Sequence, residues 1–174
     1  MTLFSEIIFF SNETITSAKF ETDNTSRESP LFEFDFFETL EENIRRFSQL
    51  GDILLCGDLN SRVGLRSDIV ENINIHRFVN APDDDDILAR LPVRKSSDKT
   101  TNCYGNKLLS LCKLSSLYIL NGRLEPGNFT CYNLSRKTAA SSIVDYVICD
   151  KNLYDIVKTM CVHELSEYSD HILS

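Results

Sequence analysis

The stretch ILLCGDLN, from Ile53 to Asn60, predicts a buried β-strand that ends in polar residues. Ile53 to Cys56 is a continuous apolar run, the pattern of a central strand covered on both faces. Asp58 and Asn60 follow two residues apart, so their side chains project toward the same side of the strand's end. There Asp58 can orient a water molecule and Asn60 can hold a phosphate oxygen. The alternative is a structural turn in which an Asx side chain binds the backbone.

Apolar spacing predicts helices and further strands on both sides of this stretch. Residues 31–50 form the clearest helix, because apolar residues recur at helical intervals at Phe37, Leu40, Ile44 and Phe47. Residues 61–101 are rich in loop-forming residues. The other predicted elements are a helix at Asn106–Leu114, a helix capped by Asp150, and strands at Leu117–Leu120, Phe129–Tyr132, Ile143–Cys149 and Met160–Leu165. Strands that alternate with helices indicate a layered α/β (α+β) fold.

Length and composition are those of one domain without a membrane span. The chain has 174 residues, 42% of them apolar, which is enough for a core. No stretch approaches the roughly 20 apolar residues that a transmembrane helix needs. The six cysteines are scattered irregularly and lack a C-x-x-C pair, so we expect reduced thiols and no disulfide partner. An intracellular location, nuclear or cytoplasmic, is therefore expected.

The acidic charge of the chain is concentrated in its first part. The formal net charge is −8, yet residues 1–50 carry 10 of the 26 acids and only 4 of the 18 bases. Residues 87–137 contain nine bases and two acids. This stretch could face a polyanion, since phosphate binding needs Lys and Arg. The alternative is a loop and a helix with ordinary solvated charges.

A second candidate group lies toward the end of the chain. Asp145 interrupts the otherwise apolar stretch Ile143 to Cys149. A buried carboxylate needs a partner. His171, which follows Asp170, is the natural candidate, because a carboxylate can hold an imidazole in one tautomer and orient it toward a phosphate. The alternative is a structural histidine.

Taken together, these residues resemble a known family. Five motifs occur in the order seen in the endonuclease/exonuclease/phosphatase superfamily: GDLNSRVG (Gly57 to Gly64), NGR (Asn121 to Arg123), GNFTCYN (Gly127 to Asn133), SSIVDYVICD (Ser141 to Asp150) and SDH (Ser169 to His171). The chain looks most like the endonuclease domain of non-LTR retrotransposons. The stretch RKSSDKTTNCYGNKLLSLC (Arg94 to Cys112) is similar to that subgroup in particular. The resemblance covers about residues 29–174.

The resemblance implies a β-sandwich core flanked by helices, which hydrolyses a phosphodiester by water attack. Asp58 would activate the water, and Asn60 would help to bind the phosphate. Asp145 would pair with His171, which stabilises charge on the scissile phosphate. Thr130 falls where the family places a residue beside the DNA.

The resemblance also implies a divalent metal at one end of the sandwich, to which Asp170 would contribute. Mg²⁺ is the expected ion, with Mn²⁺ as the alternative, because the ligands are hard oxygens and no His/Cys cluster suggests zinc.

Residues 1–28 depart from the family pattern. A complete domain has several strands and a glutamate metal ligand before the helix at residues 31–50. The motif EIIFFSNET (Glu6 to Thr14) resembles one such strand, which makes Glu13 a candidate ligand; the alternative is a polar turn residue. Between Glu13 and Ser29 the sequence ETDNTSRES (Glu21 to Ser29) is polar and turn-like, which leaves no room for the other strands. We therefore expect a short divergent head at 1–28 and an incomplete, N-terminally truncated domain at 29–174.

Three functions remain open from the sequence. The first is a Mg²⁺-dependent DNA endonuclease of retrotransposon type, impaired by truncation. The second is a non-catalytic retroelement remnant that binds nucleic acid weakly through residues 87–137. The third is a phosphatase of the same superfamily, which the stretch Arg94 to Cys112 disfavours.

Overall fold

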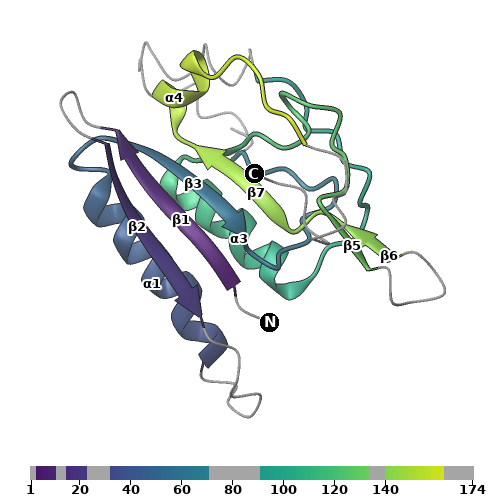
Figure 1. The fold of residues 1–174 in the computed structure, drawn as a ribbon, viewed down its shortest axis with the longest axis horizontal. Helices are drawn as coiled ribbons and strands as arrows, with labels where there is room; N and C mark the ends of the chain where they lie inside the picture. Colours follow the sequence, from purple (N-terminus) through teal and green to yellow (C-terminus); the bar gives the residue numbers. More distant parts are fainter. Residues whose placement is uncertain (1–2, 11–14, 23–31, 71–90, 134–139, 163–174) are drawn as a thin grey trace, which may run out of the picture.

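The computed structural model of the chain describes residues 3–10, 15–22, 32–70, 91–133 and 140–162. These residues form a five-stranded sheet in the order β2-β1-β3-β7-β4 and a two-stranded sheet of β5 and β6, and every strand pair is antiparallel. The strands are β1 (Leu3–Phe10), β2 (Ile15–Thr22), β3 (Asp52–Asp58), β4 (Tyr118–Ile119), β5 (Cys131–Asn133), β6 (Ala140–Ser142) and β7 (Asp145–Cys149). The helices are α1 (Phe32–Phe47), α3 (Cys103–Ser115) and α4 (Lys151–Ile156). The predicted mixture of helices and strands is confirmed (Figure 1).

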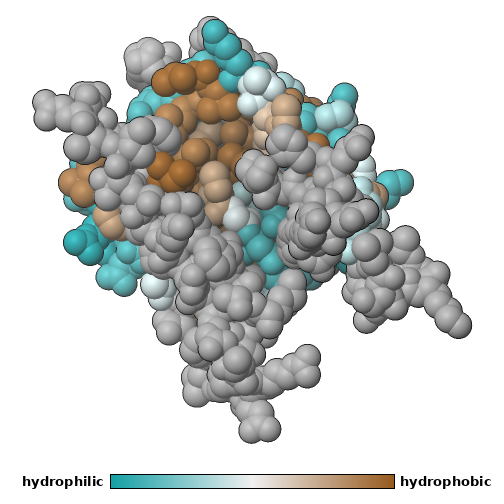
Figure 2. Space-filling view, in the orientation of Figure 1, coloured by the Kyte–Doolittle hydropathy of each residue, from teal (hydrophilic) through white to brown (hydrophobic). Residues whose placement is uncertain are grey.

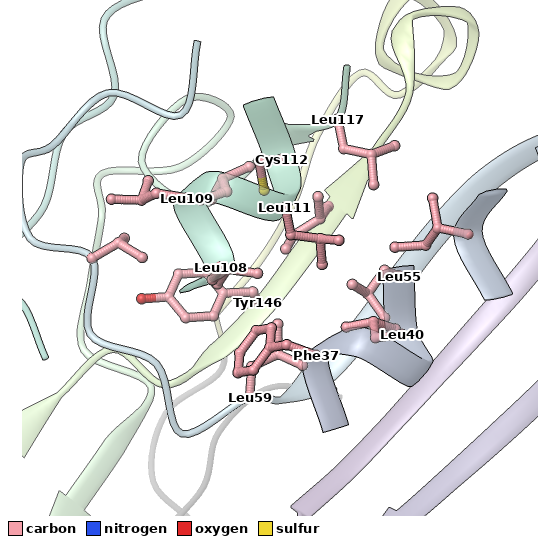
Figure 3. Close-up of a cluster of buried hydrophobic side chains, with 14 of the residues drawn as sticks. Phe37, Leu40, Leu55, Leu59, Leu108, Leu109, Leu111, Cys112, Leu117 and Tyr146 are labelled. Atoms are coloured by element: carbon pink, nitrogen blue, oxygen red, sulfur yellow. The ribbon is translucent and has the colours of Figure 1, made fainter. Parts of the chain in front are cut away.

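The main core lies between the five-stranded sheet and the pair of helices α1 and α3 (Figure 3). The predicted helix at residues 31–50 is confirmed, and its apolar spacing buries Phe37, Leu40 and Ile44 in this layer. The other large buried side chains of the layer come from β3, β7 and α3, and include Ile53, Leu55, Tyr146, Ile148, Leu108 and Leu111. Burial of this contiguous apolar surface is the main stabilising contribution to the fold.

The opposite face of the sheet is covered less completely. Leu54 and Cys56 alternate with the core residues of β3 and are half-buried, so the prediction that this strand is buried on both faces was wrong. A smaller cluster forms here, in which Leu54 and Val147 pack with Leu153 of α4. Figure 2 shows apolar side chains gathered on the face of the molecule seen in Figure 1.

The N-terminal hairpin differs from the sequence prediction. The stretch between Glu13 and Ser29, expected to leave no room for further strands, contains the edge strand β2, which pairs along its full length with β1. The β-branched and aromatic residues Ile15, Thr16 and Phe20 favour a strand, although polar residues follow them directly. In turn β1 pairs with β3 from Ser5↔Gly57 to Phe10↔Asp52, so this hairpin extends the same sheet as the GDLN strand.

Several helices and strands begin or end at other residues than predicted. The second helix starts at Cys103 rather than Asn106, because the Asn102 side chain accepts a hydrogen bond from the Gly105 amide and caps it. The strands predicted at Leu117–Leu120 and Phe129–Tyr132 are observed as β4 and β5, with shifted or shorter bounds. Asp150 caps α4, as predicted, by accepting the amide of Leu153.

Residues 160–162 of the last predicted strand are not in a strand, and the rest of it lies outside the described residues. Within the described ranges, no helix is long and apolar enough to cross a bilayer.

Candidate functional site

Two acidic residues lie opposite each other at one end of the sheet. β3 and β7 are antiparallel neighbours, and the last pair in their register is Asp58 opposite Asp145. Residues directly opposite each other in an antiparallel pair project to the same face, with Cβ atoms about 5 Å apart. Both residues are buried, at 8% and 5% exposure. The fold thus brings together two acids that are 87 positions apart in the sequence, on the face that α1 and α3 do not cover.

The turn after β3 is built around Asp58 and Asn60. The backbone amide of Asn60 donates a hydrogen bond of 2.8 Å to Oδ1 of Asp58, so the Asx turn considered as the alternative is present. Asn60 has a φ of 47°, a conformation that asparagine tolerates better than most residues. Its carbonyl accepts a 3.0 Å hydrogen bond from Nδ2 of Asn102, which ties the turn to the start of α3. The turn therefore orients the Asp58 carboxylate, which is compatible with either role.

Thr130 lies in the interior beside Asp145. Thr130 is 0% exposed, and its Oγ1 accepts hydrogen bonds of 3.1 Å from the backbone amides of Val144 and Asp145. In the structure, therefore, the Thr130 hydroxyl faces the backbone of a candidate catalytic residue. These hydrogen bonds define a supporting contact, and the position beside DNA that the resemblance implies stays a prediction.

Sequence reasoning missed two other residues around Asp145. Nδ2 of Asn121 donates a 3.1 Å hydrogen bond to the Asp145 carbonyl, and Oδ1 of Asn121 accepts one of 3.0 Å from the Val147 amide. Oδ2 of Asp98 accepts a 3.3 Å bond from the Ile143 amide. In the sequence, Asn121 stands only in a family motif and a turn. The available signal was an asparagine directly after the apolar strand Leu117–Leu120, where a side-chain amide can continue the strand's hydrogen bonding.

Asp98 is fixed by an arginine. Two bonds of 2.7 Å join its carboxylate to Nε and Nη2 of Arg62. Burial alone would raise the pKa of Asp98, but the Arg62 guanidinium and the backbone amides of Thr100 and Ile143 outweigh it and lower that pKa. The same hydrogen bond to Asp98 raises the pKa of Arg62. Asp98 is thus a firmly ionised acceptor beneath the segment that leads into β7.

The basic stretch 87–137 divides into internal and surface charges. Arg123 forms a buried ion pair with Asp68, and Arg94 is buried with its Nη2 donating to the Gly64 and Arg66 carbonyls. Burial lowers the pKa of Arg94. In contrast, the lysines at positions 95, 99 and 113 are exposed. Arg90, Arg136 and Lys137 lie outside the described residues. Part of the basic excess, Arg94 and Arg123, therefore makes internal contacts that stabilise the fold.

The proposed metal ligands are not in the described part of the chain. Glu13, Asp170 and His171 all lie outside it. Among the residues that the structure describes, no three His, Cys, Asp or Glu side chains form a group that could hold a metal ion. The carboxylates that are described at this end of the sheet, those of Asp58 and Asp145, are hard oxygen groups, the chemical type that Mg²⁺ prefers and soft metals do not.

Fold and site together define a mixed α/β domain with a carboxylate pair at the end of two central strands. No family model, curated protein or solved structure matches the chain.

Proposed function

We propose that this chain carries the hydrolytic site of a Mg²⁺-dependent phosphodiesterase that nicks DNA. The observation that carries the proposal is the register of β3 and β7, which pairs Asp58 with Asp145 on one face of the sheet and beside the Asn60 turn. Two acidic residues on the same face of a sheet end can orient a water molecule or a cation between them.

The roles of the residues follow the order expected from the family resemblance. Asp58 orients the attacking water and accepts its proton, while the Asn60 side chain binds a phosphate oxygen. Asp145 holds His171 in one tautomer, and the imidazole stabilises negative charge on the phosphate. Bonds to the Asn60 amide and to the Asp145 backbone support this assignment, since they restrict the positions of both acids.

A metal ion would be held by Asp170, with Glu13 as a second candidate ligand. When bound, Mg²⁺ supplies a positive charge close to the phosphate oxygens. The chain's oxygen-rich donor set supports Mg²⁺, with Mn²⁺ as the ion that replaces it most readily.

The same proposal includes a β-sandwich architecture. The half-buried apolar face that carries Leu54, Cys56 and Val147 supports it, because the inner face of a sandwich sheet packs against a second sheet. The paired strands β5 and β6 lie between Asp58 and Asp145 in the chain and are a candidate for part of that second layer.

A non-catalytic nucleic-acid-binding role is the second candidate. It is favoured by the exposed lysines 95 and 99, which flank Asp98 in the loop beside the site. Loss of one lysine should weaken such binding uniformly across sequences and reduce its dependence on salt.

A plasmid-nicking assay tests the first proposal. Supercoiled DNA is incubated with the full chain and Mg²⁺, with EDTA as the metal-free reference. We expect relaxed product only with Mg²⁺, and a loss of about 100-fold or more in Asp58→Asn. Asp155→Asn removes an exposed carboxylate from α4 and is the matched control that should nick normally.

Absence of Mg²⁺-dependent nicking at high protein concentration would refute the proposed activity. Salt-sensitive DNA binding that persists in Asp58→Asn without nicking would support the second candidate. Release of phosphate from inositol phosphates without nicking would instead indicate a phosphatase.

A further inference from the structure

β4 is too short to cover the edge of β7 at which Asp145 lies. It pairs with β7 only at Tyr118↔Cys149 and Ile119↔Ile148, and the backbone continues as far as the Leu120 amide, which bonds to the Val147 carbonyl at 2.8 Å. The chain then turns away at Gly122, whose φ is 77°. The amide of Val147 and both backbone groups of Asp145 lie beyond this point on the same edge. In a buried strand these groups need other partners.

Two side chains complete the missing part of the ladder. Like a peptide unit, the Asn121 side chain offers an N–H donor and a carbonyl acceptor: its Nδ2 donates to the Asp145 carbonyl at 3.1 Å, and its Oδ1 accepts from the Val147 amide at 3.0 Å. Oγ1 of Thr130 accepts the Asp145 amide at 3.1 Å. Asn121 and Thr130 are 1% and 0% exposed, so water does not compete for these bonds. The backbone of Asp145 is thus held at both its amide and its carbonyl.

The other edge of β7 is held by main-chain pairing. Its last register pair with β3 is Asp145 opposite Asp58, and the Leu59 amide donates a 2.9 Å bond to the Val144 carbonyl. An edge without partners can bulge, and a bulge displaces the side chain of the residue involved. A displacement of about 1 Å in a catalytic group can reduce a rate about 100-fold.

We propose that Asn121 and Thr130 are positioning residues, which replace the missing end of β4 and hold Asp145 in register with Asp58. This inference rests on the proposed function for its effect on rate, but not for its effect on the backbone. Neither side chain needs to touch the substrate. Their contribution is to keep the carboxylate pair aligned at the end of the sheet.

The test compares near-isosteric variants in the full chain. Thr130→Val keeps the shape and removes the acceptor, whereas Thr130→Ser keeps the hydroxyl. Asn121→Leu removes both the Nδ2 donor and the Oδ1 acceptor. Ile44→Val, a conservative change in the α1 core, is the control for a general loss of stability. All variants are assayed for nicking with Mg²⁺ and for amide hydrogen exchange.

We expect Thr130→Val and Asn121→Leu to lower kcat about 10- to 100-fold at nearly unchanged KM. Thr130→Ser should recover most of the rate, and Ile44→Val should keep it. Exchange of the Asp145 amide should accelerate at least tenfold in Thr130→Val but not in Ile44→Val. Because hydrogen exchange does not depend on catalysis, it tests whether Thr130 holds the Asp145 backbone even if the wild-type chain fails to nick DNA. Unchanged exchange at Asp145, or a loss of rate equal to that of Ile44→Val, would overturn it.

Discussion

Replacing Asp68 by asparagine should destabilise the fold more than any exposed substitution. Asp68 is 1% exposed and binds Nη1 and Nη2 of Arg123 at 2.7 and 2.9 Å. Its Oδ2 also accepts the Ile119 amide at 2.8 Å. Arg123 in turn donates to the carbonyls of Ile119 and Pro92, so the pair joins three loops to β4. Asparagine keeps an oxygen for the Ile119 amide but leaves the arginine charge without its counterion.

The magnitude follows from the burial of both partners. The side chains of Arg123 and Asp68 are 2% and 1% exposed, so solvent does not screen an unpaired charge. Loss of one member of a buried pair costs about 3–5 kcal/mol. We therefore expect about 3 kcal/mol for Asp68→Asn and a similar loss for Arg123→Met. The double variant removes both charges and should cost about 2 kcal/mol, less than either single change.

Urea unfolding of the four proteins, followed by circular dichroism, measures these free energies. With a slope of about 2 kcal/mol per molar, the single variants should lose about 1.5 M in midpoint. The double-mutant cycle then gives a coupling of about 4 kcal/mol, which is independent of the other contacts of each residue. If the effects of the two single variants simply add in the double variant, the Asp68–Arg123 pair does not contribute to stability as predicted.

Two further predictions concern titratable groups. Because the pKa of Asp98 is lowered in the folded state, its ionised form stabilises the fold above the unfolded value of about 3.9, and this contribution disappears as the pH falls through the folded pKa. The difference in urea midpoint between wild type and Asp98→Asn should therefore narrow from pH 5 toward pH 2; a constant difference would contradict the assignment. Burial raises the pKa of Cys149 to about 12 and also raises that of Cys112, while Cys103 and Cys161 are exposed. In a thiol-labelling time course, Cys103 and Cys161 should react first, and labelling of Cys112 before unfolding would show that the core opens locally.

Local patterns predicted the elements that depend on nearby residues. The helix at residues 31–50 was predictable because its apolar spacing buries one face, and the Asp150 cap because its bond spans three residues. The strand before GDLN was predictable from its apolar run. Boundaries were less predictable where a distant side chain sets them. Asn102, for example, accepts the Arg62 amide as well as that of Gly105.

The site itself was only partly predictable. Asp58, Asn60 and Asp145 could be selected from the sequence because each is a polar residue next to an apolar strand. Their pairing could not be derived from spacing, since a shift of one residue in register would send one of them to the other face. Roles for Glu13, Asp170 and His171 remain predictions.

What the sequence determined by itself was the set of local elements and the chemical types of residue at the ends of the strands. Tertiary structure alone decided that Asp145 lies opposite Asp58, that Asn121 completes a strand, and that Arg123 belongs to the interior. The physical reason is that register and burial depend on how all layers pack together. The local sequence around an asparagine or arginine is the same whether its side chain faces water or binds a backbone group that lacks a main-chain partner.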